Sequence, residues 1–102
     1  MLKEEIQQLA RENYEQAISN RRHLHTHPEL SFREYKTSAF VKARLDELGI
    51  AWKAVAGTGI TAIIEGEKPS GRVIALRADM DALPISEANA VSYASQNKGV
   101  MH

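Results

Sequence analysis

Three histidines and two aspartates are the residues of this chain whose types and spacing could do chemistry. His23, His25 and His27 alternate within RRHLHTHPELSF, and imidazole is the commonest metal ligand. On a helix, His23 and His27 would share a face and could approach one ion, while His25 would point away. Pro28 should push His27 out of the helix, and Leu24 stands where an H-E-x-x-H zinc helix has its glutamate. We therefore favour packing and hydrogen bonding of these imidazoles at a helix end over a metal site.

The two aspartates, Asp79 and Asp81, follow an apolar run in RADMDALP. On an extended backbone their side chains point the same way, and ligands of open α/β sheets bind beyond such strand ends. Two neighbouring carboxylates can raise one another's pKa, or can share a cation or a histidine. Three interpretations stay open: a functional pair, an Asx-type turn that ends the strand, and an ion pair between Asp79 and Arg77.

The composition is that of a soluble globular protein without a charge bias. The 102 residues suit one small domain, with 43% apolar and 25% charged residues, and 13 basic side chains balance 13 acidic ones. The absence of cysteine excludes a disulfide framework and a thiolate metal cage built by this chain. No apolar stretch approaches the roughly 20 residues that cross a bilayer, and the N-terminus is too polar for a secretory signal. We expect a cytoplasmic protein without nucleic-acid or membrane partners.

Two helices should come first along the chain. Apolar residues near helical spacing predict a helix over residues 2–27, ended by Pro28. A second helix is predicted over residues 32–48, with an S-x-x-E capping box formed by Ser31 and Glu34. Gly49 is its expected stop.

Strands and a long loop should follow the helices. Residues 51–55 and 60–65 flank Gly57-Thr58-Gly59, which we interpret as a hairpin turn, because the G-x-G is too short for a phosphate loop and no helix follows it. A second turn is predicted at 66–71. The continuous apolar run at 72–78 predicts a strand buried on both faces, and residues 79–102 predict a loop. The expected fold class is α/β, and the sheet looks incomplete.

Four stretches resemble the N-terminal segment of the M20 metallopeptidase superfamily. They are RRHLHTHPELSFREYKT, VAGTGITAIIEG, VIALRADMDALPI and YASQNKGVMH. The resemblance is strongest to the amidohydrolase branch, which includes N-acyl-amino-acid amidohydrolases, hippurate hydrolase and N-acetyldiaminopimelate deacetylase. It implies that residues 1–102 are the N-terminal portion of an α/β, zinc-peptidase-like catalytic domain, with two helices followed by strands of a mixed sheet. The lid domain and most metal ligands would lie outside this portion.

The resemblance also implies a chemistry for the parent enzyme and a role for three residues. A divalent metal, Zn or Mn, would polarise an amide carbonyl and lower the pKa of the attacking water. Asp81, with Pro84, matches the family's His-x-Asp-x-x-Pro motif, in which the aspartate orients a metal ligand. Asp79 occupies the motif's histidine position and is not assigned as a ligand. His102 would line the site, because the family's Cys-Gly-His-Asp ligand segment follows such a Met-His pair.

Two hypotheses about the chain follow. In the first, it is an N-terminal fragment of an amidohydrolase that cleaves N-acyl amino acids or related small, peptide-like conjugates. This fragment alone is expected to bind no metal and to be inactive, and a homo-oligomeric parent is left open. In the second, the chain is a non-catalytic interaction module that retains part of the fold and pairs its unfinished sheet with another chain.

Overall fold

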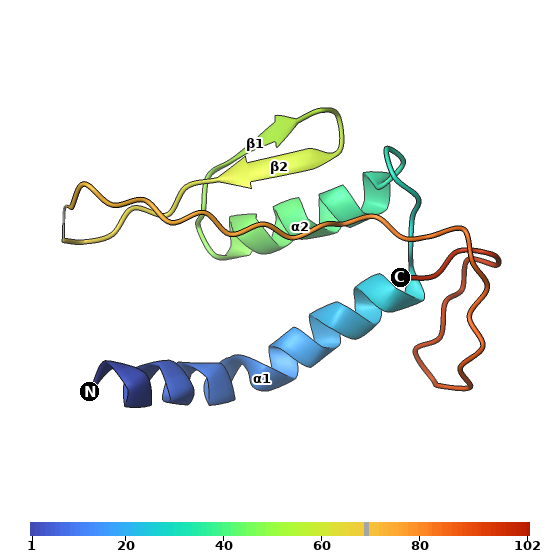
Figure 1. Ribbon diagram of the computed structural model, residues 1–102, viewed down its shortest axis with the longest axis horizontal. Helices are drawn as coiled ribbons and strands as arrows, with labels where there is room; N and C mark the ends of the chain where they lie inside the picture. The colour runs from blue at the N-terminus through green and yellow to red at the C-terminus, as the bar shows by residue number, and fades with distance from the viewer. Residues whose placement is uncertain (69) are drawn as a thin grey trace.

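Two helices and one β-hairpin make up the regular structure of the described part of the chain (Figure 1). The computed structural model describes residues 1–68 and 70–102. The elements are α1 (Leu2–Thr26), α2 (Tyr35–Glu47), β1 (Trp52–Val55) and β2 (Gly59–Ala62). In Figure 1, α2 lies between α1 and the hairpin, and the long C-terminal segment crosses in front of α2 before it folds around the end of α1.

The first predicted helix is confirmed, and it ends one residue earlier than predicted. Thr26 is the last helical residue and His27 follows with a φ of −120°, immediately before Pro28. The N-terminal half of α1 is exposed, including the side chains of Leu2, Ile6 and Leu9. Neither helix among the described residues combines the length and apolar character needed to span a membrane.

The second helix begins at Tyr35, three residues later than predicted, and the predicted capping box is wrong. Phe32 adopts a φ of +65°, which takes the backbone off a helical path before Glu34. Glu34 is buried, and its carboxylate accepts a hydrogen bond of 2.6 Å from the hydroxyl of Thr58 in the hairpin turn. The tertiary contact with the hairpin has therefore replaced the local cap that the S-x-x-E pattern predicted.

Glu29, in the loop between the helices, caps α2 instead. Its carboxylate accepts hydrogen bonds from the amide of Lys36 (3.2 Å), the amide of Thr37 (2.6 Å) and the hydroxyl of Thr37 (2.7 Å). Burial works to raise the pKa of Glu29, but these hydrogen bonds and the charge of Lys36 outweigh it and hold the pKa below its usual value. A carboxylate at the positive end of the helix dipole also stabilises the first turn.

The predicted stop at Gly49 is confirmed. Gly49 has a φ of +70°, a conformation that an L-residue with a side chain rarely adopts. Its amide donates to the carbonyl of Asp46 (3.0 Å), and the amide of Ile50 donates to the carbonyl of Leu45 (2.9 Å). These two bonds form the Schellman motif that satisfies the last carbonyls of a helix.

The hairpin is confirmed too, with shorter strands than predicted. β1 and β2 pair antiparallel, with Trp52 opposite Ala62 and Val55 opposite Gly59. Ala56 and Gly57 both have positive φ, as tight hairpin turns require. The turn at 66–71 includes Pro69, which lies outside the described residues.

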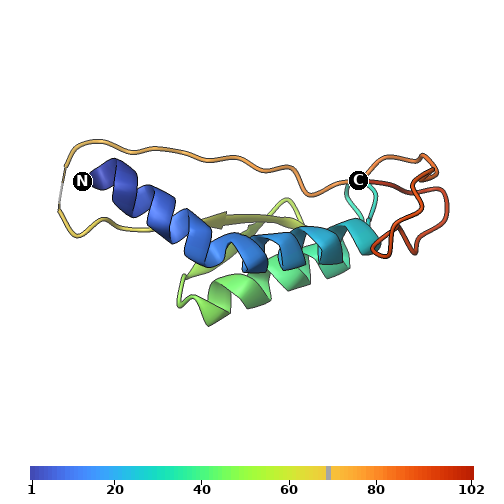
Figure 2. The ribbon, with the colours of Figure 1, turned by 90° about the horizontal axis from the view of Figure 1, so that it is seen from below.

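The predicted strand at 72–78 is wrong for this chain. Within the described residues this segment pairs with no strand, and Val73, Ile74 and Leu76 are 95%, 88% and 96% exposed. Ile63 and Ile64, which leave the hairpin, are 81% and 78% exposed. Figures 1 and 2 show the chain projecting beyond α2 where it leaves the hairpin, and Figure 1 shows it returning across α2. A strand buried on both faces needs a paired edge and covering layers, which the described residues do not supply. We call residues 63–64 and 72–78 the open edge.

Candidate functional site

Three distant parts of the chain meet at the C-terminal end of α1. The amide of Ala82 donates to the carbonyl of Glu29 (2.8 Å), which forms a parallel bridge between Leu30 and Ala82. Leu83 and Met101 exchange two backbone hydrogen bonds of 2.9 and 3.0 Å. The backbone beside Asp81 and the backbone beside His102 are thereby fixed next to one another.

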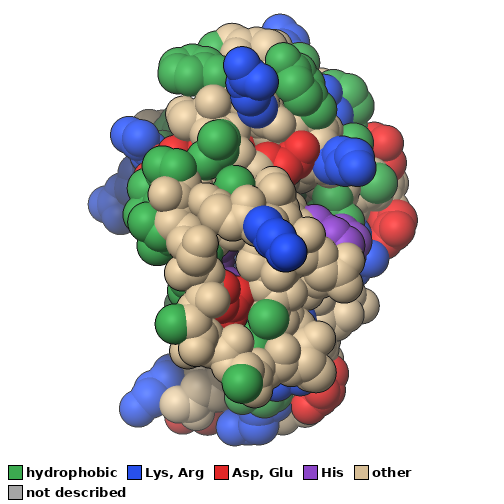
Figure 3. Space-filling view, turned by 90° about the vertical axis from the view of Figure 1, so that its right-hand side faces the viewer, with side chains coloured by type: hydrophobic (Ala, Val, Ile, Leu, Met, Phe, Trp, Pro, Cys, Tyr) green, Lys and Arg blue, Asp and Glu red, His purple; other side chains and the backbone are tan. Residues whose placement is uncertain are grey.

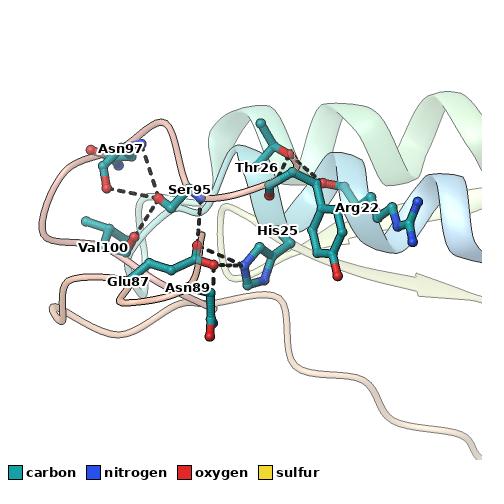
Figure 4. Close-up of polar contacts among 9 residues, drawn as sticks. Arg22, His25, Thr26, Glu87, Asn89, Ser95, Asn97 and Val100 are labelled. Carbon is teal, nitrogen blue, oxygen red and sulfur yellow. Dashed lines mark hydrogen bonds and ion pairs between the residues drawn. The ribbon is translucent and has the colours of Figure 1, made fainter. Parts of the chain in front are cut away.

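Residues 93–100 are tied to the end of α1 by further hydrogen bonds, and Figure 4 shows this region around Thr26 and Ser95. The hydroxyl of Thr26 donates to the carbonyl of Tyr93 (3.0 Å), and the amide of Gln96 donates to the carbonyl of Thr26 (2.9 Å). The side-chain amide of Asn97 donates to the carbonyl of Pro28 (3.1 Å). Polar contacts, more than apolar packing, hold this end, because Ala82 and Val100 are the buried apolar side chains that form the core of the described residues.

A buried, hydrogen-bonded pair of His25 and Glu87 lies at the centre of these contacts (Figure 4). His25 Nε2 is 2.9 Å from Glu87 Oε1 and 3.1 Å from Oε2, and the two side chains are only 7% and 5% exposed. The amide of Ser95 donates to Glu87 Oε1 at 2.7 Å. These hydrogen bonds, the one from Ser95 first and the one from His25 next, hold the pKa of Glu87 below its usual value. We call residues 25–30, Glu87 and residues 93–101 the polar cluster.

The three histidines at the end of α1 lie on two sides of the helix. His23 stacks on Phe40 of α2 with 4.3 Å between ring centroids, and His27 lies 4.9 Å from His23 on the same side. His25 faces the other way, with its ring edge-on to Tyr93 at 5.9 Å and to His102 at 5.8 Å. The structure thus shows the packing that we favoured for these imidazoles, and a side-chain hydrogen bond for His25.

The two aspartates lie at one wall of a hollow of about 650 Å³ between α2, the hairpin and the extended segment. Glu34 and Thr58 lie on other parts of its lining. Asp79 is exposed and pairs with Arg77, whose Nη2 is 3.1 Å from Asp79 Oδ1. Of the three interpretations, the ion pair with Arg77 therefore describes Asp79, while Asp81 is fixed by the neighbouring bridge at Ala82.

The described side chains do not form a metal-ligand set. Among residues 1–68 and 70–102, no group of three or more His, Cys, Asp or Glu side chains converges in a way that could hold a metal ion. The structure places Asp81 and His102 at the same end of the molecule, and it places Asp79 in the pair with Arg77.

Sequence reasoning missed Glu87, which has more contacts in this region than either aspartate. A signal was present, because Glu87 is the only charged residue between Ala82 and Asn97. Figure 3 shows the molecule from this end, where backbone and uncharged polar atoms cover most of the middle of the surface. When the single carboxylate of this uncharged segment is buried, it needs hydrogen-bond partners from elsewhere in the chain. His25 is one of them.

Comparisons with known proteins give one consistent answer. No family model matches the chain. The chain is 50% identical over 103 residues to an N-acyl-L-amino acid amidohydrolase from Geobacillus stearothermophilus, and it covers 28% of that protein. It is 49% identical over 90 residues to a putative amidohydrolase from Bacillus subtilis, of which it covers 22%.

Solved structures agree with the sequence relatives. A dinuclear metal-binding peptidase of the M20 family from Bacillus subtilis matches 90% of the chain with a TM-score of 0.83 and 42% identity. A putative aminohydrolase from methicillin-resistant Staphylococcus aureus matches the whole chain with a TM-score of 0.87 and 42% identity. The chain covers 26% and 27% of these two proteins. It therefore spans about a quarter of the length of its relatives, as a partial domain of their fold.

Proposed function

We propose that this chain, which resembles about a quarter of the length of M20-family and amidohydrolase relatives, forms scaffold beside the metal centre of an enzyme that hydrolyses N-acyl amino acids. The observation that carries the proposal is the 50% identity, over the entire chain, to an N-acyl-L-amino acid amidohydrolase. The segment would be the N-terminal portion of the catalytic domain, in a cytoplasmic enzyme.

The proposed role of the segment is to hold two residues beside the reacting atoms. Asp81 would orient a metal ligand, and the bridge between Leu30 and Ala82 fixes the backbone that carries it. His102 would line the site, and the pairing of Met101 with Leu83 sets its position relative to Asp81. A bound Zn or Mn would polarise the scissile carbonyl and activate water. Its ligands and the general base would come from the other three-quarters of the enzyme, so residues 1–102 alone would be inactive.

A hybrid enzyme tests this proposal. Residues 1–102 would replace the matching 103 residues of the Geobacillus amidohydrolase, and hydrolysis of a panel of N-acetyl-L-amino acids would be measured with Zn or Mn added. We expect the hybrid to turn over these substrates, and the relative that lacks the matching segment to show no turnover. A folded, metal-loaded hybrid without amidohydrolase activity would refute the proposed function.

The two aspartates should differ in this hybrid. Asp81→Asn should lower kcat by about 10- to 100-fold, the usual cost of losing a group that orients a metal ligand. Asp79→Asn should cost less, because Asp79 is exposed and paired with Arg77. Steady-state kinetics and metal content of the two variants check the prediction. A larger loss of kcat for Asp79→Asn than for Asp81→Asn would indicate that Asp79, and not Asp81, orients the metal ligand.

The exposed open edge favours a second candidate function, an interaction module that pairs this edge with another protein. Such a module would need none of the enzyme's other parts. An inactive hybrid, together with a well-folded 102-residue chain that binds a partner through residues 72–78, would favour this candidate.

A further inference from the structure

The His25–Glu87 pair joins residues 62 positions apart in the sequence and is almost completely removed from water. Taking an imidazole and a carboxylate out of water is costly unless their hydrogen-bonding groups are satisfied. The carboxylate meets this condition, with partners on His25, Ser95 and Asn89. The proposed hydrolysis, as described above, makes no use of either member of the pair.

We propose that His25 and Glu87 are positioning residues that fix the course of residues 93–102 past Asp81. The inference rests on the proposed function, since it assigns these two residues to the same site. The pair would act through the backbone and would touch neither the substrate nor the metal.

A continuous series of contacts leads from the pair to His102. Glu87 accepts a hydrogen bond from the amide of Ser95 at 2.7 Å. The hydroxyl of Ser95 donates to the carbonyl of Val100 at 2.7 Å and lies 3.0 Å from the carbonyl of Asn97. Val100 is buried, and the next residue, Met101, pairs with Leu83. Removal of Glu87 would release Ser95, and with it the turn that sets the register of Met101.

The geometry around His25 supports the same conclusion. Its ring makes edge-on contacts with the rings of Tyr93 and His102. The ring centroids of these two residues lie 5.9 and 5.8 Å from that of His25. His25 is fixed in turn by its place near the C-terminal end of α1, so the helix acts as the rigid reference for the loop. A side chain buried among loop residues and carried by a helix is suited to positioning that loop.

The test uses His25→Ala, Glu87→Ala and Glu87→Gln in the hybrid enzyme. Both alanine variants should lower kcat by about 10- to 100-fold, because residues 93–102 would lose their fixed course past Asp81. The double alanine variant should lose no more than either single variant, since the two residues act as one unit. Glu87→Gln should recover most of kcat, because its amide oxygen can still accept from Ser95.

A matched control separates positioning from a general loss of stability. Gly49→Ala strains the far end of α2, where φ is +70°, and it should lower the melting temperature without lowering kcat at temperatures where the hybrid is folded. Hydrogen exchange at the Ser95 amide gives a second readout that does not need activity. Exchange should become at least tenfold faster in both alanine variants. This corresponds to a decrease of about 1.4 kcal/mol in the free energy of opening that hydrogen bond.

The outcomes are distinguishable. Unchanged kcat and unchanged Ser95 exchange in the alanine variants would overturn the inference, as would a parallel loss of kcat in Gly49→Ala. Faster Ser95 exchange in the variants of a folded but inactive hybrid would support the positioning contact and refute the proposed function instead.

Discussion

The polar cluster and the open edge differ in what their own chain provides. In the polar cluster, hydrogen bonds between segments more than 60 residues apart satisfy a buried carboxylate, a buried imidazole and several backbone groups. At the open edge, five large aliphatic side chains are at least 78% exposed, namely Ile63, Ile64, Val73, Ile74 and Leu76. One end is complete within this segment, while the other presents surface that a folded domain would bury.

This difference shows how the segment would serve a larger enzyme. The polar cluster fixes the residues proposed to lie beside the metal centre, and its hydrogen bonds join segments of these 102 residues. The open edge would receive strands and covering layers from the rest of the catalytic domain. Substitutions at the two ends should therefore have different effects in the chain alone and in the hybrid enzyme.

The largest effect is expected at the open edge. Ile74→Lys combined with Leu76→Lys should prevent folding of the hybrid, because two ammonium groups would have to enter a sheet that the sequence pattern predicts to be buried on both faces. In the 102-residue chain the same pair should leave the melting curve almost unchanged and reduce self-association. Thermal unfolding and sedimentation velocity measure both effects. Equal losses of stability in the chain and the hybrid would contradict the distinction between the two ends.

A smaller effect is expected at Glu29, within the polar cluster. Glu29→Ala removes the cap of α2 and should lower the free energy of unfolding by about 1–2 kcal/mol, in the chain and in the hybrid alike. Because the pKa of Glu29 is lowered in the folded state, its contribution is present above about pH 4.5 and is lost as the pH falls through the folded pKa. The difference between wild type and Glu29→Ala should thus shrink in acid. Denaturant unfolding at neutral and acidic pH measures it, and a difference independent of pH would argue against a cap by the ionised carboxylate.

Local patterns predicted the helices, the Gly49 stop and the hairpin well, because the residues that determine them are neighbours in the sequence. The predicted capping box of Ser31 and Glu34 was wrong because the carboxylate of Glu34 accepts a hydrogen bond from Thr58, which is far along the chain. The prediction of a buried strand at 72–78 was wrong because its apolar pattern fits a strand covered on both faces. The described residues leave this segment exposed.

The assignment of Asp81 and His102 to a site came from the resemblance to the M20 family and stays a prediction. The structure brings the backbones beside these two residues together through pairings at Ala82 and Leu83. The ion pair of Asp79 with Arg77 was one of the stated alternatives. The partnership of His25 with Glu87 could not be read from spacing, because 62 residues separate the two and neither belongs to a local motif.

Hydrogen exchange of the 102-residue chain, compared with the same residues in the hybrid, separates the polar cluster from the open edge in one experiment. We expect the amides of Ser95, Gln96 and Met101 to be protected in both. The amides of residues 72–78 should exchange freely in the chain and become protected only in the hybrid. Protection of residues 72–78 in the monomeric chain, or polar-cluster amides that exchange freely there, would contradict this expectation.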